Sequence, residues 1–359
     1  MGREVHPSVL LMKAFAVRPL QPRSARVIEL PRPEPRDHEA LIEVLEVGIC
    51  GTDAEINDGL YGAAPPGEEF LILGHEILGR LENGELVVPM VRRGCSTCSH
   101  CRRGEQDMCD SGSFCERGIK GVHGGVCSHI TEDPSMLIPV PPSARSYAVL
   151  LEPMSVVAKG LRHSLRIQER FRWEPHRALV VGAGPIGLLA TLSLRAMGWE
   201  VVTAARKPAK SAKAAIVDAA GASYHSVSDA SLLSLAEDGS TFDLIFEASG
   251  SAEAAFDSIH ALSANGVLCL TSITGGDALK SIPCDRINRD LVLGNKVIFG
   301  VVNANRRDFI DGLDSLERIE KAFPGTLRNL LTHRVGFDDA AGLFDIQRTG
   351  IKTVFEVSR

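Results

Sequence analysis

A run of four cysteines between residues 95 and 109 constrains this 359-residue chain more than any other stretch. Its sequence, CSTCSHCRRGEQDMC, spaces the thiols as C-x2-C-x2-C-x7-C. Short loops let four sulfurs converge on one small, soft cation, and a closed shell of four thiolates is how proteins hold structural zinc. The predicted ligands are Cys95, Cys98, Cys101 and Cys109.

Two other uses of four nearby cysteines stay open from the spacing alone. Disulfides would need an oxidising compartment, which nothing in the sequence indicates. An iron–sulfur cluster also takes four thiolates. Zinc is favoured, because the lobe at residues 92–112 has little apolar sequence of its own and metal binding would have to drive its folding.

The length of 359 residues favours about two domains. A net charge of −6 offers no basis for binding nucleic acid or a membrane surface, and no apolar run is long enough to cross a membrane. Residues 1–11 lack the pattern of a secretory signal, so we expect a flexible extension or a true start at Met12. With the remaining cysteines taken as reduced thiols, the protein is expected to be cytoplasmic.

Short strands separated by Pro and Gly turns dominate residues 12–92, so the first domain is expected to be mainly β. Two apolar stretches there end in glycine beside a metal-binding residue type. The strand-like run 41–47 leads into GICG with Cys50, and the run 70–73 leads into GHE with His75. Because glycine allows tight turns and close approach, Cys50 and His75 are predicted to hold a second metal.

From residue 178 the pattern changes to alternating strands and helices. A compact strand at 178–181 enters GAGPIG, a G-x-G-x-x-G motif, and helix-spaced apolar residues and a second strand at 201–203 follow. This is the context that the dinucleotide motif requires, and it predicts a doubly wound parallel sheet with a pyrophosphate at the helix N-terminus. The predicted cofactor contacts are Gly182, Gly184, Pro185, Ile186 and Gly187.

The residues after the second strand bear on the choice of cofactor. NAD enzymes usually place a carboxylate about 20 residues beyond the glycine motif, to bind the ribose 2′-hydroxyl. Residues 203–207 read TAARK and contain no carboxylate. Arg206 and Lys207 can pair with a 2′-phosphate, which predicts a preference for NADP with some use of NAD. A solvated basic loop is the alternative.

Taken together, these motifs resemble the zinc-containing medium-chain alcohol dehydrogenase superfamily, and within it the glucose (aldose) 1-dehydrogenases of archaea. The resemblance covers nearly the whole chain from Met12. It rests on the segments CGTDAEI (50–56), VPMVRRGC (88–95), ERGI (116–119), EPMSVV (152–157) and VNANRR (302–307).

The resemblance implies an α/β fold with a GroES-like mainly-β catalytic domain over residues 12–155 and a Rossmann domain over residues 156–305. A C-terminal segment, 306–359, would return to the catalytic domain. Two departures stand out. Residues 81–85 look shorter than their family counterpart, and His129 stands where relatives usually carry Glu.

The resemblance also implies two zinc ions per chain and roles for individual residues. The catalytic zinc would be held by Cys50, His75 and Glu152, with Glu76 beside the metal and able to exchange with it. Three ligands leave one position for a substrate oxygen.

The resemblance also implies which residues contact the sugar and the cofactor. Glu116, Glu152 and Asn303 would face the sugar, and Thr52 matches a hydroxyl that assists proton transfer. Asn303 and Asn305 join the implied NADP contacts.

The implied reaction is hydride transfer from C1 of an aldose, with D-glucose the first choice, to NADP, giving the aldonolactone. We expect a homo-oligomer of two or four chains. Two alternatives remain at this point: a polyol or L-threonine dehydrogenase of the same superfamily, and a zinc- and nucleotide-binding protein without catalysis. The intact set of Cys50, His75 and Glu152 argues against the second.

Overall fold

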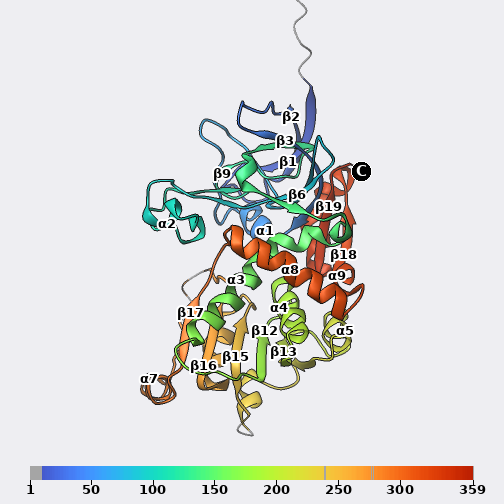
Figure 1. Ribbon diagram of the computed structural model, residues 1–359. Coiled ribbons are helices and arrows are strands. Elements are labelled where there is room, and N and C mark those ends of the chain that lie inside the picture. Colours follow the sequence, from blue (N-terminus) through green and yellow to red (C-terminus); the bar gives the residue numbers. More distant parts are fainter. Residues whose placement is uncertain (1–9, 238–239, 276, 278, 359) are drawn as a thin grey trace, which may run out of the picture. The chain divides into compact units, whose positions relative to one another are not determined.

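The computed structural model describes residues 10–237, 240–275, 277 and 279–358, so residues 1–9 of the expected extension lie outside the described part. The chain divides into two compact units (Figure 1). The first unit comprises the chain up to Glu152 with 304–306 and 331–359, and the second comprises 153–303 and 307–330.

The first unit is mainly β, as expected for residues 12–155. Its elements are β1 (Leu11–Val17), β2 (Arg26–Pro31), β3 (Ala40–Ile49), α1 (Gly51–Asn57), β4 (Leu71–Ile72), β5 (Glu76–Leu81), β6 (Leu86–Pro89), β7 (Arg92–Arg93), α2 (Ser99–Arg102), β8 (Cys115–Arg117), β9 (Gly121–Val122), β10 (His129–Glu132), β11 (Leu137–Val140), β18 (Leu331–Val335), α10 (Leu343–Thr349) and β19 (Lys352–Glu356).

The largest sheet of the first unit has the order β11-β6-β5-β3-β19-β18, and β10 also pairs with β3. Along β3, Ile42 and Val44 are buried and alternate with half-buried residues, and Val47 is buried beyond a register shift between Val44 and Glu46. Strand β19 belongs to the C-terminal segment and pairs antiparallel to β3, with Thr353 opposite Ile49. The short segment 81–85 closes a tight turn in which the Leu81 N–H donates to the Glu85 carbonyl at 2.9 Å.

The second unit alternates helices with strands. Its elements are α3 (Leu151–Gln168), β12 (Arg177–Val181), α4 (Pro185–Ala196), β13 (Glu200–Ala205), α5 (Ala212–Ala219), β14 (Ser223–Ser226), β15 (Phe242–Glu247), α6 (Ala252–Asp257), β16 (Leu262–Leu270), α7 (Cys284–Leu293), β17 (Val297–Gly300), α8 (Arg306–Ala322) and α9 (Thr326–Asn329).

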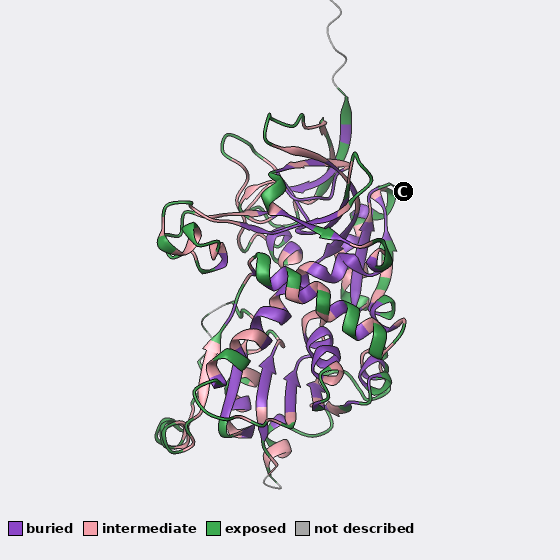
Figure 2. Ribbon diagram, in the orientation of Figure 1, coloured by how far each residue is buried: buried purple, intermediate pink, exposed green. Residues whose placement is uncertain are grey.

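Six parallel strands of this unit form one sheet in the order β14-β13-β12-β15-β16-β17. In chain order this is third, second, first, fourth, fifth and sixth, the arrangement of dinucleotide-binding folds. The central strands β12 and β15 are buried over most of their length, as the purple in Figure 2 shows, because helices cover both faces of such sheets. The predicted fold class is therefore confirmed.

Two boundaries differ from the expectation. The first unit ends at Glu152 rather than at 155, within the first turn of α3, where a proline such as Pro153 is tolerated. The segment 306–359 is divided: α9 contacts α5 in the second unit, whereas β18 and β19 join the sheet of the first unit.

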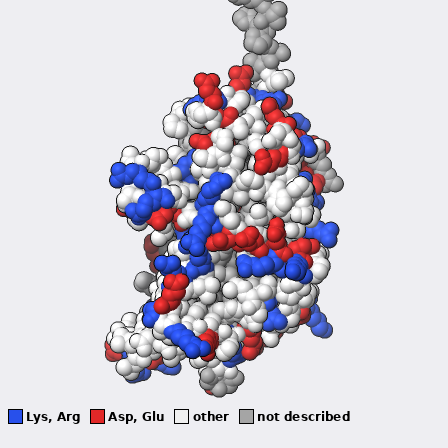
Figure 3. Space-filling view, viewed as in Figure 1, with Lys and Arg blue, Asp and Glu red and all other residues white. Residues whose placement is uncertain are grey.

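Among the described residues, every helix is too short or too polar to cross a membrane. Figure 3 shows acidic and basic side chains interspersed over the visible face.

Candidate active site

Three side chains with metal-binding groups converge in the first unit where β3 ends and β5 begins. Cys50 follows β3 and is the N-cap of α1, while His75 and Glu76 lie at the start of β5, the antiparallel neighbour of β3. The ligand atoms of Cys50, His75 and Glu76 all lie within 4.8 Å of one another. The pairing of β3 with β5 therefore brings Cys50 close to His75, which lies 25 positions later in the sequence.

The chemistry of this cluster fits a zinc ion. His75 and Glu76 are buried, with 5% and 1% exposure. The Nδ1 atom of His75 and the Oε2 atom of Glu76 have no hydrogen-bond partner among the described residues. Buried polar atoms without partners are costly, and thiolate, imidazole and carboxylate are the ligands that zinc takes in proteins. A bound cation would compensate for the missing hydrogen bonds.

Asp53 joins the two strand ends that carry the cluster. Its Oδ2 atom accepts the N–H of Cys50 at 2.8 Å, and its Oδ1 atom accepts the N–H of Gly74 at 3.0 Å and lies 3.6 Å from Nδ1 of His75. Burial alone would raise the pKa of Asp53, but the interaction with His75 and the hydrogen bonds from the N–H groups of Cys50 and Gly74 together outweigh it and lower that pKa. Burial alone would lower the pKa of His75, but Asp53 outweighs it and raises that pKa well above its ordinary value.

The role of Asp53 was missed in the sequence, although a signal existed. An acidic residue three positions after a helix N-cap commonly accepts the N-cap N–H, and Cys50 and Asp53 have this spacing.

Lys352 on β19 is a second neighbour that sequence reasoning missed. Its Nζ atom donates to Oε1 of Glu76 and, at 3.2 Å, to the carbonyl of Ile49. Lysine is rarely buried as deeply as the 2% exposure of Lys352 unless it is paired. Burial alone would lower the pKa of Lys352, but Glu76, Cys50 and Glu152 together outweigh it and raise that pKa. In the sequence, Lys352 shows only as a lysine at the start of an apolar strand, and this pattern is a weak sign of a role beside a metal site.

Glu152 lies in the first turn of α3, where the helix dipole favours a carboxylate. It is outside the group of three that lies within 4.8 Å. It still interacts electrostatically with that group: burial, and then the charge of Glu76, raise the pKa of Glu152 to about 7, against the opposing effects of His75 and Lys352. The structure thus brings three of the four predicted ligands together and places the fourth within electrostatic range.

The residues expected to face the sugar have different surroundings. Glu116 of β8 lies opposite Arg92 of β7, whose Nε and Nη2 atoms approach Oε1 of Glu116 at 3.0 and 2.9 Å. The basic partner of Glu116 is therefore Arg92, which the sequence did not predict. Thr52 lies near the start of α1, close to the phenol of Tyr61, which donates to Oε2 of Glu55 at 3.0 Å.

Asn303 and Asn305 fall in different units. Asn303 belongs to the second unit and has a left-handed backbone with φ of 59°. Asn305 belongs to the first unit, where its Nδ2 atom donates to Oδ1 of Asp107 at 3.0 Å.

The four-cysteine cluster is arranged as a metal site. The sulfurs of all four cysteines lie within 4.8 Å of one another, and the thiols are free. The N–H of Cys98 donates to the sulfur of Cys95 at 3.3 Å, and the N–H of Cys101 donates to that of Cys98 at 3.4 Å. Hydrogen bonds from Ser111 and then Thr97 lower the pKa of Cys95 to about 5. These donors favour thiolates, which are the form that binds zinc.

The glycine motif forms a cradle between β12 and α4. Gly182 has φ of 109°, which favours glycine, and a Cβ on Gly187 would collide with the carbonyl of Gly182. A Cβ on Gly184 would meet nothing within 4 Å, so a ligand can approach the backbone there. Gly184 is also the N-cap of α4 and makes no side-chain cap hydrogen bond. The first N–H groups of α4 therefore suit a pyrophosphate.

A basic cluster follows the second strand of the nucleotide fold. Arg206 and Lys207 come directly after β13, and Lys213 lies in the first turn of α5. Burial, and then the positive charges of Lys207 and Arg206, lower the pKa of Lys213, so the three cations lie close enough to repel one another. Three cations at this place suit a 2′-phosphate. Lys213 was not predicted as a cofactor contact, because the sequence around it gave no sign that it lies near Arg206 and Lys207.

Comparisons with known proteins agree with both units. The Alcohol dehydrogenase GroES-like domain matches residues 36–142, and the Glucose dehydrogenase C-terminus matches residues 145–357. A glucose 1-dehydrogenase of Methanocella arvoryzae is 45% identical over 96% of this chain and 99% of its own length. One from Thermoproteus tenax is 36% identical over 96% of this chain and 99% of its own.

Solved structures give the same result. Glucose dehydrogenase of Haloferax mediterranei, in complex with NADP, Zn and gluconolactone, matches with a TM-score of 0.90 and 32% identity over 97% of this chain and 99% of that one. L-idonate 5-dehydrogenase of Escherichia coli matches with a TM-score of 0.78 at 18% identity, which shows a shared fold. Because the glucose dehydrogenase model covers more than half of the chain and relatives align over nearly their whole length, this chain belongs to the glucose dehydrogenase family of zinc-containing medium-chain alcohol dehydrogenases.

Proposed function

We propose that this protein is a zinc-dependent glucose 1-dehydrogenase that transfers a hydride from C1 of D-glucose to NADP and releases gluconolactone. The observation that carries the proposal is the cluster of Cys50, His75 and Glu76, with Glu152 nearby, in a chain 45% identical to a glucose 1-dehydrogenase. The Haloferax enzyme, at 32% identity, is seen with NADP, Zn and gluconolactone, the cofactor, metal and product of this reaction.

Cys50, His75, Glu152 and Glu76 would hold the catalytic zinc, and the four cysteines of the lobe would hold a structural one. Zinc at the first site would supply Lewis-acid polarisation of the reacting oxygen. Asp53 orients His75 through its carboxylate, and Lys352 fixes one oxygen of Glu76. These contacts position the ligands and hold their protonation states, as partners behind metal ligands generally do.

Three polar residues of the first unit, Glu116, Glu152 and Thr52, bind and orient the sugar in this proposal. Glu116, held by Arg92, and Glu152 offer carboxylate oxygens to sugar hydroxyls, and Thr52 offers a hydroxyl that can pass on a proton. Asn303, which belongs to the second unit, would be a further sugar contact. A site that hydrogen-bonds several hydroxyls rejects alcohols lacking them far better than an apolar pocket can.

The second unit binds NADP in this proposal. Gly184 and the N-terminus of α4 receive the pyrophosphate, while Arg206, Lys207 and Lys213 pair with the 2′-phosphate. The first unit is accordingly the catalytic domain. The nine free cysteines support a cytoplasmic location.

The proposal also includes a homo-oligomer of two or four chains. Strand β17 is an edge strand of the six-stranded sheet, and the preceding helix α7 exposes Val292 and Leu293, at 66% and 77%. Open sheet edges and exposed apolar side chains are features that oligomers cover.

A steady-state screen of the zinc-loaded protein over aldoses, polyols and L-threonine, with NADP and with NAD, tests the function. We expect D-glucose oxidation with a higher kcat/KM for NADP than for NAD. Replacing Glu116 with Gln should lower kcat/KM for glucose, because a charge-assisted hydrogen bond to the sugar is lost. The proposal fails if sorbitol or threonine is oxidised well while every aldose is ignored.

A further inference from the structure

The first unit contains a cavity of about 570 Å³ that is separate from both predicted zinc sites. None of the predicted metal ligands lines it. One side of the cavity is apolar and includes Met12, Leu30, Ile72 and Ile130. Small-molecule sites have volumes of about 300–1,000 Å³ and combine apolar walls with a few convergent polar groups. The cavity therefore has the size and the apolar component of a ligand site.

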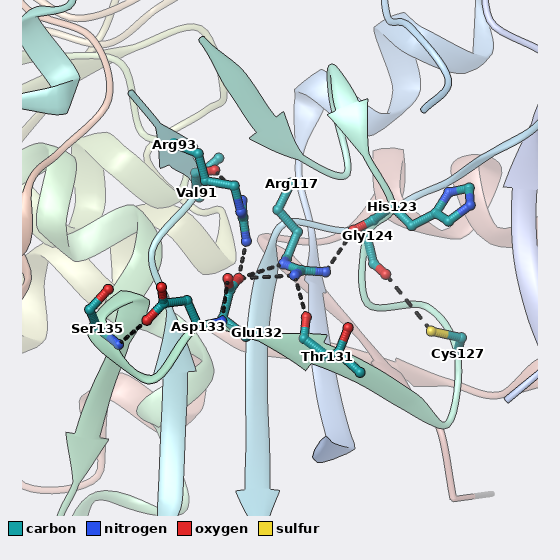
Figure 4. A network of polar contacts seen from close by, with 10 residues as sticks. All are labelled: Val91, Arg93, Arg117, His123, Gly124, Cys127, Thr131, Glu132, Asp133 and Ser135. Carbon is teal, nitrogen blue, oxygen red and sulfur yellow. Dashed lines mark hydrogen bonds and ion pairs between the residues drawn. The ribbon is translucent and has the colours of Figure 1, made fainter. Parts of the chain in front are cut away.

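The lining also includes two arginines that share one carboxylate (Figure 4). Nε and Nη2 of Arg117 lie 3.1 and 2.9 Å from Oε2 of Glu132, and Arg93 donates to the same oxygen. The side chains of Arg93, Arg117 and Glu132 are only 20%, 6% and 5% exposed. Two guanidinium groups beside one carboxylate leave one positive charge in excess. Because these side chains are buried, water solvates that charge poorly.

The remaining charged side chains of the lining are Arg36, Glu39 and Glu68, so the lining as a whole carries as many carboxylates as guanidinium groups, and the excess is local to Arg93, Arg117 and Glu132. Glu68 lies 2.7 Å from Nε2 of His123, and Glu39 accepts the N–H of Arg36 at 3.2 Å. His129 also lines the cavity and hydrogen-bonds to Ser128. Burial, and then the positive charge of Arg93, lower the pKa of Arg117 well below its ordinary value, against the smaller opposing effects of Cys127 and Glu39.

The two arginines are not equally available to a ligand. Arg117 also donates to the carbonyls of His123 and Thr131, each at 2.8 Å, so all three of its side-chain nitrogens are engaged. Arg93 donates through Nη1 to the carbonyl of Val91 at 2.9 Å and through Nη2 to Glu132. A guanidinium has five N–H donors. Arg93 therefore keeps donors for an incoming anion, whereas Arg117 acts as a fixed charge behind it.

Strand alternation separates this cavity from the proposed sugar residues. Successive side chains of a strand point to opposite faces, so Arg92 and Glu116 share one face of the β7–β8 pair while Arg93 and Arg117 share the other. We infer that the cavity binds a small organic anion, whose carboxylate or phosphate pairs with Arg93 and whose apolar part lies against Met12, Ile72 and Ile130. This inference does not depend on the proposed reaction.

Methyl NMR of the zinc-loaded, NADP-saturated full-length protein, labelled at Ile δ1 and Met ε, tests the site. Hexanoate, hexanamide, acetate and inorganic phosphate are titrated separately. We expect hexanoate to shift the methyl signals of Met12, Ile72 and Ile130, and to bind more tightly than acetate or hexanamide. The relative affinities of acetate and phosphate distinguish a carboxylate from a phosphate preference. Ile49, which adjoins Cys50, reports binding at the metal cluster instead.

Replacing Arg93 with Met should weaken hexanoate binding about tenfold or more, since a hydrogen bond to a charged group is lost. Arg93→Lys keeps the positive charge but loses the planar, forked guanidinium. Its affinity for hexanoate should lie between those of the wild type and Arg93→Met. Arg80→Met is the matched control, because Arg80 is an exposed arginine paired with Glu43. An unchanged Ile245 signal in the second unit verifies folding.

Three results would overturn the inference: no shift at millimolar concentrations of any anion, equal affinity for hexanoate and hexanamide, or equal affinity of hexanoate for the wild type and Arg93→Met. A shift of Ile49 without one of Ile130 would also overturn it.

Discussion

At the scale of single residues, the metal cluster depends on neighbours that touch its ligands. Asp53 bonds to both strand ends and faces Nδ1 of His75. Asp53→Asn removes the negative charge but keeps the shape, so we expect zinc affinity at the catalytic site to fall about 10- to 100-fold. Competition with a chelator measures this affinity. Asp58→Asn, at the exposed end of the same helix, should leave it unchanged, and an unaltered affinity in Asp53→Asn would refute the role.

Proton uptake follows from the same residues. Without metal, His75 has a pKa well above its ordinary value and Glu152 has one of about 7, so at neutral pH His75 is protonated and Glu152 is partly so. Zinc needs the unprotonated forms, so its binding must release protons and its affinity must rise between pH 6 and pH 8, about one unit either side of neutrality. Calorimetry in buffers of different ionisation enthalpy measures the release.

Glu152→Gln provides the control for this prediction, since it should reduce the number of protons released at pH 7. A zinc affinity that is flat with pH would contradict the assignment of these protons.

At the scale of elements, the two predicted metal sites lie on different parts of the fold. The four thiols of one lie in the lobe around α2, whereas Cys50, His75 and Glu76 of the other lie at the adjoining ends of β3 and β5 in the main sheet. Cys98→Ser should lower the melting temperature and release one zinc, because metal binding folds such lobes. His75→Ala should abolish activity and leave most of the stability. Elemental analysis and calorimetry check both, and a single zinc in fully active wild-type protein would disprove the pair of sites.

The β13–α5 connection sets cofactor choice in our proposal. Lys213→Met should raise KM for NADP about tenfold, since one charge-assisted contact to the 2′-phosphate is lost, and should leave KM for NAD nearly unchanged. Lys210→Met, on the same loop, is the control. Equal effects on the two cofactors would show that Lys213 acts on the fold rather than on the phosphate.

At the scale of the whole molecule, the exposed apolar side chains of α7 beside the edge strand β17 predict an assembly of two or four chains. Light scattering should give twice or four times the chain mass of 38.6 kDa. Leu293→Asp should shift the assembly toward smaller species, because a charge would be buried at the interface, while Leu233→Asp should not. A wild-type monomer at all concentrations would refute this.

The sequence by itself determined the features that depend on local spacing. Four cysteines a few residues apart converge wherever the lobe lies, and a glycine turn after a buried strand identifies the nucleotide fold. Only the tertiary structure decided the partners. Lys352 and Glu76 are 276 positions apart, and Arg93 and Glu132 are 39 apart, on strands whose periodicity shows which face is buried but not which residue lies opposite. Those contacts depend on the register of distant strands, which long-range packing selects and no local pattern encodes.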